Sequence, residues 1–239
     1  TPAGFWDGDI DEVAVFDGEL TSGEIGDIFL AGLAGNGICG GAAPPPPPAG
    51  GCPDDIVSNW TFDAGDATDS ADGNDGTVFG ATPTTGQVNG AMSFDGVNDY
   101  ISVPDDASLN FGTSAFTVVA WVKTGSTAQK NIVSKGFSGS APSWYVEIQP
   151  SGIVRAGTQN GGNYRLRDTT TTVNDDVYHN VAAVIRGFQT ADVDIYIDGV
   201  LSDTSDLSSG SALTTFNNSN PFQIGARSHF GSPAGFWDG

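Results

Sequence analysis

The sequence is poor in positive charge. Its 239 residues hold eight Lys and Arg against 29 Asp and Glu, a formal net charge of −21. A surface with this charge repels the phosphates of nucleic acids and anionic lipid headgroups, so we exclude both as partners. It attracts divalent cations or suits a saline setting, where salt screens the self-repulsion. The chain also lacks any run of about eighteen apolar residues, so we expect no membrane insertion.

Cysteine is rare as well. Cys39 and Cys52 bracket the segment GGAAPPPPPAGG, and no histidine lies nearby in the sequence to complete a metal site. We expect a disulfide that closes this loop, which is typical of extracellular proteins; two free thiols, or a bridge to another chain, are the alternatives. Because five consecutive prolines form a stiff stretch, residues 36–53 are predicted to be a linker between a short piece, 1–35, and a long piece, 54–239.

The long piece is a succession of β-prone segments separated by Gly, Asn, Asp and Ser. In residues 116–124 (FTVVAWVKT) both alternating faces are largely apolar, as expected of a central strand that is covered on both sides. We therefore predict an all-β fold, a two-sheet antiparallel jelly-roll sandwich. The predicted strands are 56–62, 91–96, 99–103, 116–124, 131–136, 144–149, 152–158, 179–186, 193–199 and 222–226.

The short piece combines one strand with one helix. In the strand, simple alternation places Ile10, Glu12, Ala14 and Phe16 on one face. The helix is predicted from the capping-box pair of Thr21 and Glu24, and a glycine at position 32 can end it. One strand and one helix cannot bury a core alone, so this piece must belong to something larger.

Five motifs give the chain a family resemblance. Residues 90–124 (GAMSFDGVNDYISVPDDASLNFGTSAFTVVAWVKT) resemble the opening of laminin G-like domains of the concanavalin A-like jelly-roll superfamily. The stretches 178–184 (YHNVAAV), 195–201 (IYIDGVL) and 222–226 (FQIGA) follow in the family's order. The family's closing phrase, G-x-IDEV followed by a short helix, is absent after residue 226 and stands at 8–25 instead. The resemblance implies the fold, in permuted order, and says little about function.

The chain also repeats one heptapeptide. Residues 2–8 and 233–239 both read PAGFWDG, which is an offset of 231 residues. We expect a tandem array with this period, in which one sandwich comprises residues 54–239 and residues 8–35 of the next copy. The alternatives are a single permuted domain whose residues 8–16 fold back on their own chain, and separate subunits that donate residues 1–35 to a neighbour. The predicted inter-copy strand consists of Asp9, Ile10, Asp11, Glu12, Val13, Ala14, Val15 and Phe16.

Two acidic stretches are candidate calcium sites. The loop 66–76 (DATDSADGNDG) and the segment 7–12 (DGDIDE) offer the hard oxygens that calcium prefers. The resemblance implies a structural calcium near the first and last strands of the sandwich, where both stretches should lie. A solvated acidic loop is the alternative, because Asp is also a common turn residue. The predicted ligands are Asp69, Asn74 and Asp11, with Asp63 and Asp72 as alternates.

Catalysis is not expected. Glucanases of this superfamily carry a Glu-x-Asp-x-Glu strand, whose paired carboxylates cleave the glycosidic bond. The nearest stretches here, 9–13 and 192–199, do not supply the two glutamates. The predicted function is a structural repeat of an extracellular filament or adhesion protein, with further copies of the chain as partners. The alternative is a carbohydrate-binding module of a secreted protein, which would bind surface glycans with exposed aromatic residues. The candidate aromatic residues are Trp144, Tyr145, Tyr164 and Phe230.

Overall fold

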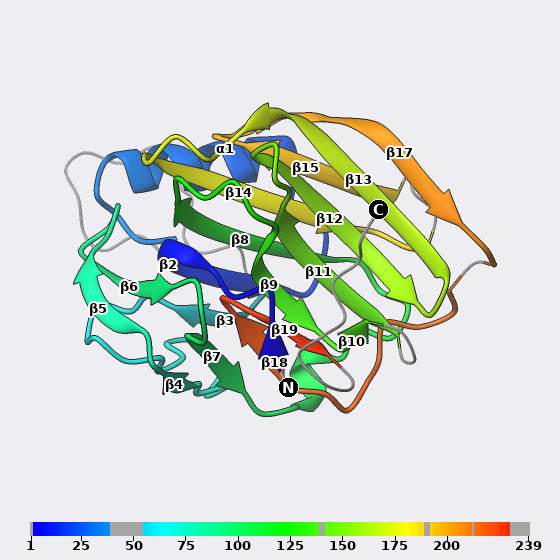
Figure 1. The fold of residues 1–239 in the computed structure, drawn as a ribbon, viewed down its shortest axis with the longest axis horizontal. Helices are drawn as coiled ribbons and strands as arrows, with labels where there is room; N and C mark the ends of the chain where they lie inside the picture. Colours follow the sequence, from blue (N-terminus) through cyan, green and yellow to red (C-terminus); the bar gives the residue numbers. More distant parts are fainter. Residues whose placement is uncertain (1, 39–54, 139–141, 189–191, 212, 230–239) are drawn as a thin grey trace.

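The fold is the predicted all-β sandwich with a single helix among the described residues (Figure 1). The computed structural model describes residues 2–38, 55–138, 142–188, 192–211 and 213–229. Two large sheets pack face to face, and three short strands form a small additional sheet. Cys39, Cys52 and Phe230 lie outside the described residues, so the disulfide stays a prediction.

The first large sheet has eight strands, and its neighbouring pairs are antiparallel. It carries the long hairpins of the middle of the chain. In spatial order its strands are β17 (Asp203–Ser209), β13 (Asn163–Thr172), β12 (Ile153–Asn160), β11 (Ser143–Ile148), β9 (Lys130–Lys135), β18 (Phe222–Ile224), β7 (Tyr100–Val103) and β4 (Thr77–Phe79).

The second large sheet contains the first long strand of the chain at an internal position. In Figure 1 this dark-blue strand, β2, lies between the green β8 and the blue-green β6. The spatial order is β16 (Val200–Leu201), β15 (Val193–Ile197), β14 (Tyr178–Ile185), β8 (Phe116–Lys123), β2 (Asp7–Phe16), β6 (Gly90–Asp95) and β5 (Thr82–Thr85), and β3 (Ile56–Trp60) also pairs with β2. The small sheet is β1 (Pro2–Ala3), β19 (Arg227–His229) and β10 (Phe137–Ser138).

Aromatic rings fill the space between the two large sheets. The ring centroids of Trp60 and Phe222 are 5.2 Å apart, and those of Phe116 and Trp144 are 4.9 Å apart. All four side chains are fully buried, and each ring contributes roughly 1.5–3 kcal/mol through burial. One face of the strand 116–124 packs into this core, and its other face is also covered, which explains why both faces are apolar.

The cover of that other face is the helix α1 (Ser22–Leu33). Its N-terminus is the predicted capping box: the Thr21 hydroxyl accepts from the Glu24 amide, and the Glu24 carboxylate accepts from the Thr21 amide. Ile25 and Ile28 pack against Phe16 and other residues on the outer face of the second sheet. Residues 2–38 therefore supply both an internal strand and the helix that covers it.

A β-bulge in β2 corrects the predicted alternation. The pairing with β8 shifts between Asp11 and Ala14, and Glu12 has a φ of 50° in the left-handed region. The inserted residue reverses the pattern, so that Val13 joins the main core while Ala14 faces the helix. Simple alternation was wrong here because a bulge leaves no period in the sequence.

The predicted linker, residues 36–53, lies in the part of the chain between β2 and β3, and these two strands are neighbours in one sheet. β2 ends at Phe16, β3 begins at Ile56, and the two strands pair antiparallel. The Asp17 amide donates to the Asp55 carbonyl over 2.8 Å, so the chain leaves and re-enters the sheet at the same place. In this structure residues 8–16 pair with strands of their own chain, as in the alternative of a single permuted domain. The tandem array and the exchange of residues 1–35 between copies stay predictions.

Among the described residues, no helix has the length and hydropathy needed to cross a bilayer.

Two glycines of α1 give a matched test of its packing. A Cβ at Gly32 would collide with the Trp121 indole, whereas a Cβ at Gly26 would meet nothing within 4 Å. We expect Gly26→Ala to raise the free energy of unfolding by up to about 1 kcal/mol through helix propensity. Gly32→Ala should lower it despite the same gain, because the helix must move off Trp121. Urea denaturation measures both, and equal stabilisation by the two variants would contradict this packing.

Candidate functional site

The candidate site is the place in the fold that the N-terminal segment fills. β2 pairs with β8 along one edge, and along the other edge it pairs first with β6 and then with β3. Its hydrogen bonds are therefore satisfied on both sides, as in any internal strand. We call this position the strand slot. Without β2, the slot would expose unpaired backbone groups on three strands and open the core between the sheets.

The heptapeptide Pro2–Gly8 leads into the slot and has contacts of its own. β1 pairs antiparallel with β19, with Pro2 opposite Ser228 and Ala3 opposite Arg227. The Gly4 carbonyl accepts from the Asn131 amide over 2.9 Å. The Trp6 amide donates to the Gly225 carbonyl over 2.7 Å, and the Thr124 hydroxyl donates to the Asp7 carbonyl over 2.5 Å. The ring centroids of Phe5 and Tyr100 are 6.1 Å apart. We call these surroundings the heptapeptide seat.

The seat demands this particular sequence at three positions. Gly4 has a φ of 61° and Gly8 a φ of 132°, both values that L side chains rarely adopt. A Cβ at Gly4 would collide with the Asn131 side chain, and one at Gly8 with the Lys123 carbonyl. Trp6 is fully buried in the main core, among residues of both sheets. A segment that fills the seat must therefore have glycine at both places and a large ring between them.

Two carboxylates are buried where β2 bulges. The Asp11 carboxylate accepts from the Val88 amide over 2.8 Å, while its other oxygen has no hydrogen-bond partner among the described residues. Glu12 accepts from the Ile38 amide over 3.0 Å. Burial raises the pKa of Asp11 to about 8, helped by the neighbouring charges of Glu12 and Asp63, and burial raises the pKa of Glu12 to about 7. Asp11 is therefore mostly protonated at neutral pH, and Glu12 is partly protonated.

The structure divides the predicted calcium ligands into two groups. Asp69 lies in the loop after β3, where its two oxygens accept from the amides of Asn59, Ala71, Asp72 and Asn74. Asn74 uses its side-chain amide to bind the hydroxyls of Ser58 and Ser108.

Asp11 lies at the bulge, and Asp63 binds the Gly90 amide and the Asn89 side chain. Among the described residues, no three His, Cys, Asp or Glu side chains are placed to hold a metal ion. Calcium stays a prediction.

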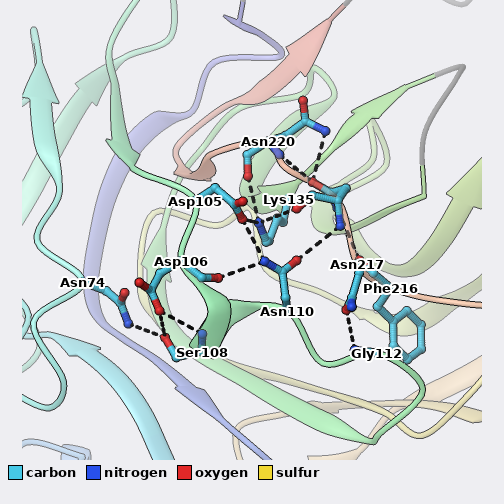
Figure 2. Close-up of polar contacts among 11 residues, drawn as sticks. Asn74, Asp105, Asp106, Ser108, Asn110, Gly112, Lys135, Phe216, Asn217 and Asn220 are labelled. Carbon is cyan, nitrogen blue, oxygen red and sulfur yellow. Dashed lines mark hydrogen bonds and ion pairs between the residues drawn. The ribbon is translucent and has the colours of Figure 1, made fainter.

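A lysine supplies the cation in another acidic loop (Figure 2). The Lys135 side chain is fully buried, and its ammonium donates to Asp105 Oδ1 at 2.5 Å, the Asn220 carbonyl at 2.8 Å and the Asn218 carbonyl at 3.2 Å. All three N–H donors are thereby used. Burial lowers the pKa of Lys135, and the hydrogen bond to Asp105 opposes that shift. Asn110 donates to Asp105 and accepts from the Asn218 amide, which ties the two loops together.

Sequence reasoning missed this lysine cluster. The sequence features that could have indicated it are the pair Asp105 and Asp106, shortly after a predicted strand, and the Asn-rich stretch 217–220. Nothing local joins the two stretches, because more than a hundred residues separate Asn110 from Asn218. The third component, Lys135, lies in β9 and reads as an ordinary polar strand residue.

The predicted glycan-binding aromatic residues do not form one platform. Trp144 is fully buried between the sheets, so its assignment to a binding surface was wrong; the ring packs against Phe116 and Phe222. Tyr145 faces outward but is only 3% exposed, because the Arg227 guanidinium lies over its ring at 3.7 Å from the centroid. Tyr164, on β13, is half-buried.

The outer face of the first sheet is nonetheless rich in polar groups around Tyr145. Glu147 accepts from the side chains of Gln129 and Gln149, and burial raises its pKa. Next to it, Arg155 forms a two-point ion pair with Asp168, with N–O distances of 2.7 and 2.8 Å. Paired charges and amide side chains of this kind are the groups that bind sugar hydroxyls in many sites.

The comparisons agree with the architecture. A sequence model of the laminin G type, described as the concanavalin A-like lectin/glucanases superfamily, matches residues 95–239, which is more than half of the chain. The chain belongs to this family. The match begins at the last residue of β6, so it omits β2 and α1.

More distant comparisons add little to the family assignment. Among solved structures, domains LG4-5 of the mouse laminin alpha1 chain are similar at 12% identity with a TM-score of 0.44, covering 59% of this chain and 35% of that one. No curated protein matches the chain. The family assignment covers residues 95–239, and in the sandwich the internal strand β2 precedes this region in the sequence.

The buried carboxylates of this laminin G-type domain predict the pH dependence of its stability. Asp11 and Glu12 have raised pKa values, so the folded chain binds more protons than the unfolded chain between about pH 4 and pH 8. Stability should therefore fall as pH rises through this window, by at most about 1.4 kcal/mol per pH unit for each group.

Denaturation between pH 5 and pH 8 in the presence of a chelator measures this slope. Asp11→Asn should flatten it. Asp95→Asn is the control. Asp95 is exposed, and hydrogen bonds from backbone amides lower its pKa, so its protonation changes the free energy of unfolding only in more acidic solution. A slope that Asp11→Asn leaves unchanged would contradict the assignment.

The lysine cluster predicts a large effect from a single charge. Asp105→Asn leaves the buried Lys135 ammonium without its counter-charge, and we expect a loss of roughly 3 kcal/mol in the free energy of unfolding. Asp106→Asn is the matched control: Asp106 is the next residue, binds the Ser108 amide and hydroxyl, and makes no ion pair with Lys135 among the described contacts. Equal losses in guanidinium denaturation would show that the ion pair is not the cause.

Proposed function

We propose that the chain is a structural repeat of an extracellular filament or adhesion protein. In such an assembly, laminin G-type sandwiches would be joined through the N-terminal segment and the Pro-rich stretch 36–53. The observation that carries the proposal is that the chain has two copies of PAGFWDG, while its described residues form one heptapeptide seat. A tandem period of 231 residues accounts for the second copy.

The position of β2 also supports a joining role. The strand slot lies in the middle of a sheet, so whichever chain supplies β2 becomes an integral part of the sandwich. The helix α1 then adds a second apolar contact on the outer face. A joint of this kind is held by a full strand and a helix, which suits a protein that spaces or connects surfaces.

Laminin G-type domains typically occur in extracellular proteins, where they are adhesion or lectin-like modules and usually not enzymes. We extend this to the chain as a non-catalytic, extracellular role. Calcium at the acidic loops and a disulfide between Cys39 and Cys52 belong to the same proposal. Its partners would be further copies of the chain.

A lectin-like module is the second candidate. The cluster around Glu147, Arg155 and Arg227 favours it, because charged and amide groups converge there on the outer face of a sheet. The low exposure of Tyr145 argues against a stacked sugar at that ring. We therefore place this candidate second.

Electron microscopy of the native protein separates the two candidates. The repeat predicts long particles with a regular spacing, and an intact mass that is a large multiple of 24.5 kDa if the copies are covalently joined. A mass near 24.5 kDa within the same long particles would indicate subunits that exchange strands. Discrete monomers that bind to immobilised glycans would refute the repeat and support the lectin-like module.

A further inference from the structure

His179 lies between two carboxylates that come from different segments of the chain. Its Nδ1 is 2.8 Å from Asp198 Oδ2, and its Nε2 is 3.1 Å from Asp175 Oδ1. Asp175 lies in the loop before β14, and Asp198 lies in the turn between β15 and β16. We propose that this arrangement is a pH-sensitive clamp: the doubly protonated ring holds the loop and the turn to β14, and loss of one proton releases the loop. The clamp goes beyond the proposed repeat function and does not depend on it.

The geometry requires a proton on both nitrogens of the His179 ring. An ionised carboxylate only accepts hydrogen bonds, so each nitrogen that binds one must donate. Neutral imidazole has one N–H group, whereas imidazolium has two. Only the charged ring can therefore donate to Asp175 and Asp198 at the same time, as the two short distances demand.

The two carboxylates also favour the charged form of the ring energetically. The hydrogen bond to Asp198 raises the pKa of His179 above its usual value, burial of the ring opposes this shift, and Asp175 adds to it. The folded chain therefore keeps this proton at pH values where the unfolded chain has lost it. The clamp contributes stability below about pH 6.5, and this contribution falls as pH rises through the raised pKa of His179.

The other charged groups near the ring have different partners. On β8, the residue opposite His179 is Val122, and the adjacent Lys123 pairs with Asp9 of β2 at 3.3 Å. The loop carries a second carboxylate, Asp176, which makes no ion pair with the ring among the described contacts. The charge on the ring is therefore set by the two carboxylates that it touches.

When the ring loses one proton, its contact with Asp198 is the one that remains. The backbone of β14 also holds Asp198: its Oδ1 accepts from the Asn180 amide over 2.9 Å, and its own amide donates to the Asn180 carbonyl over 2.9 Å. Asp175 is 62% exposed, and its hydrogen bond from the Val177 amide lies within the loop. A neutral ring that donates to Asp198 turns the lone pair of Nε2 toward Asp175, and two acceptors repel each other.

Release of the loop changes a cavity at the start of β2. The cavity has a volume of about 380 Å³, and its lining consists of residues 7–9 of β2, residues 123–126 at the end of β8, and Asp176. The Asp176 amide donates to the Thr124 carbonyl over 3.1 Å, and the Thr124 hydroxyl donates to the Asp7 carbonyl. One residue thus connects the loop to the heptapeptide seat, so the protonation of His179 controls one wall of the cavity and one support of the seat.

Nitrogen NMR of the isotopically labelled full chain measures the protonation of the ring. The chain has two histidines, and the variant His179→Gln assigns their resonances. In the parent chain both nitrogens of His179 should carry protons in mildly acidic solution, and the titration midpoint should lie above the ordinary value of about 6.5. A midpoint at or below this value would overturn the proposal.

Two neighbouring carboxylates give a matched pair of variants for this titration. Asp175→Asn should lower the midpoint, because it removes a charge that touches the ring. Asp176→Asn removes a charge from the next residue, which does not bind the ring, and should have a much smaller effect. Equal shifts in the two variants would show that the contact with Asp175 is not the cause.

Hydrogen exchange of two amides tests release of the loop itself. The Asp176 amide binds the Thr124 carbonyl, and the Asp198 amide binds the Asn180 carbonyl. The ratio of their protection factors should fall roughly two- to fivefold as His179 loses its proton, which is the effect of an ion pair at a partly exposed site. In Asp175→Asn the ratio should be low at every pH. A ratio that stays constant across the titration of the parent chain would contradict the clamp.

Discussion

The insertion of β2 between β8 on one side and β6 and β3 on the other is the contact on which the rest of the structure depends. It completes one sheet, supplies Ile10, Val13 and Val15 to the core, and anchors the helix that covers the outer face. Its partners in β8 lie about a hundred residues away in the sequence, so this pairing closes a long loop. Loop closure of this length costs entropy and slows folding, which makes an internal first strand an unusual demand on the chain.

Ion pairs and burial determine the state of many charged groups in this structure. The chain has few cations, and several of them form ion pairs with its own carboxylates: Lys135 with Asp105, Arg155 with Asp168, and Arg186 with Glu19 and Asp194. At the bulge, burial raises the pKa values of Asp11 and Glu12, so that both carboxylates bind protons at higher pH than exposed ones. Protonation and the hydrogen bonds from Val88 and Ile38 together reduce the cost of burying two acidic groups in the middle of a sheet.

Much of this fold could be predicted from the sequence, and the failures have physical causes. Patterns of β-prone residues found most of the strands, and the capping box placed the start of α1 at Thr21. They missed the short β4, and also β5, β13 and β17, whose sequences are rich in Thr, Ser, Asn and Asp. The family motifs predict that the closing strand comes first, and this stays a prediction. The bulge at Glu12 and the cluster around Lys135 could not be predicted, because a single inserted residue has no period and the cluster joins loops that are remote in the sequence. Trp144 was misassigned because an aromatic residue beside another gives no sign of which one faces the core.

The permuted order has a consequence for assembly that follows from geometry alone. The start of the chain and the end of the last described strand meet at β1 and β19, so the contacts of the sandwich are the same whichever chain supplies the closing strand. A closed chain and the proposed exchanged array would then differ in which copy residues 39–54 connect to, because residues 2–38 supply both β2 and α1. In the closed chain the Asp17 amide donates to the Asp55 carbonyl, so the ends of β2 and β3 meet. If copies exchange this segment as proposed, the interface is common to both forms, and the balance between them depends on the connection and on concentration.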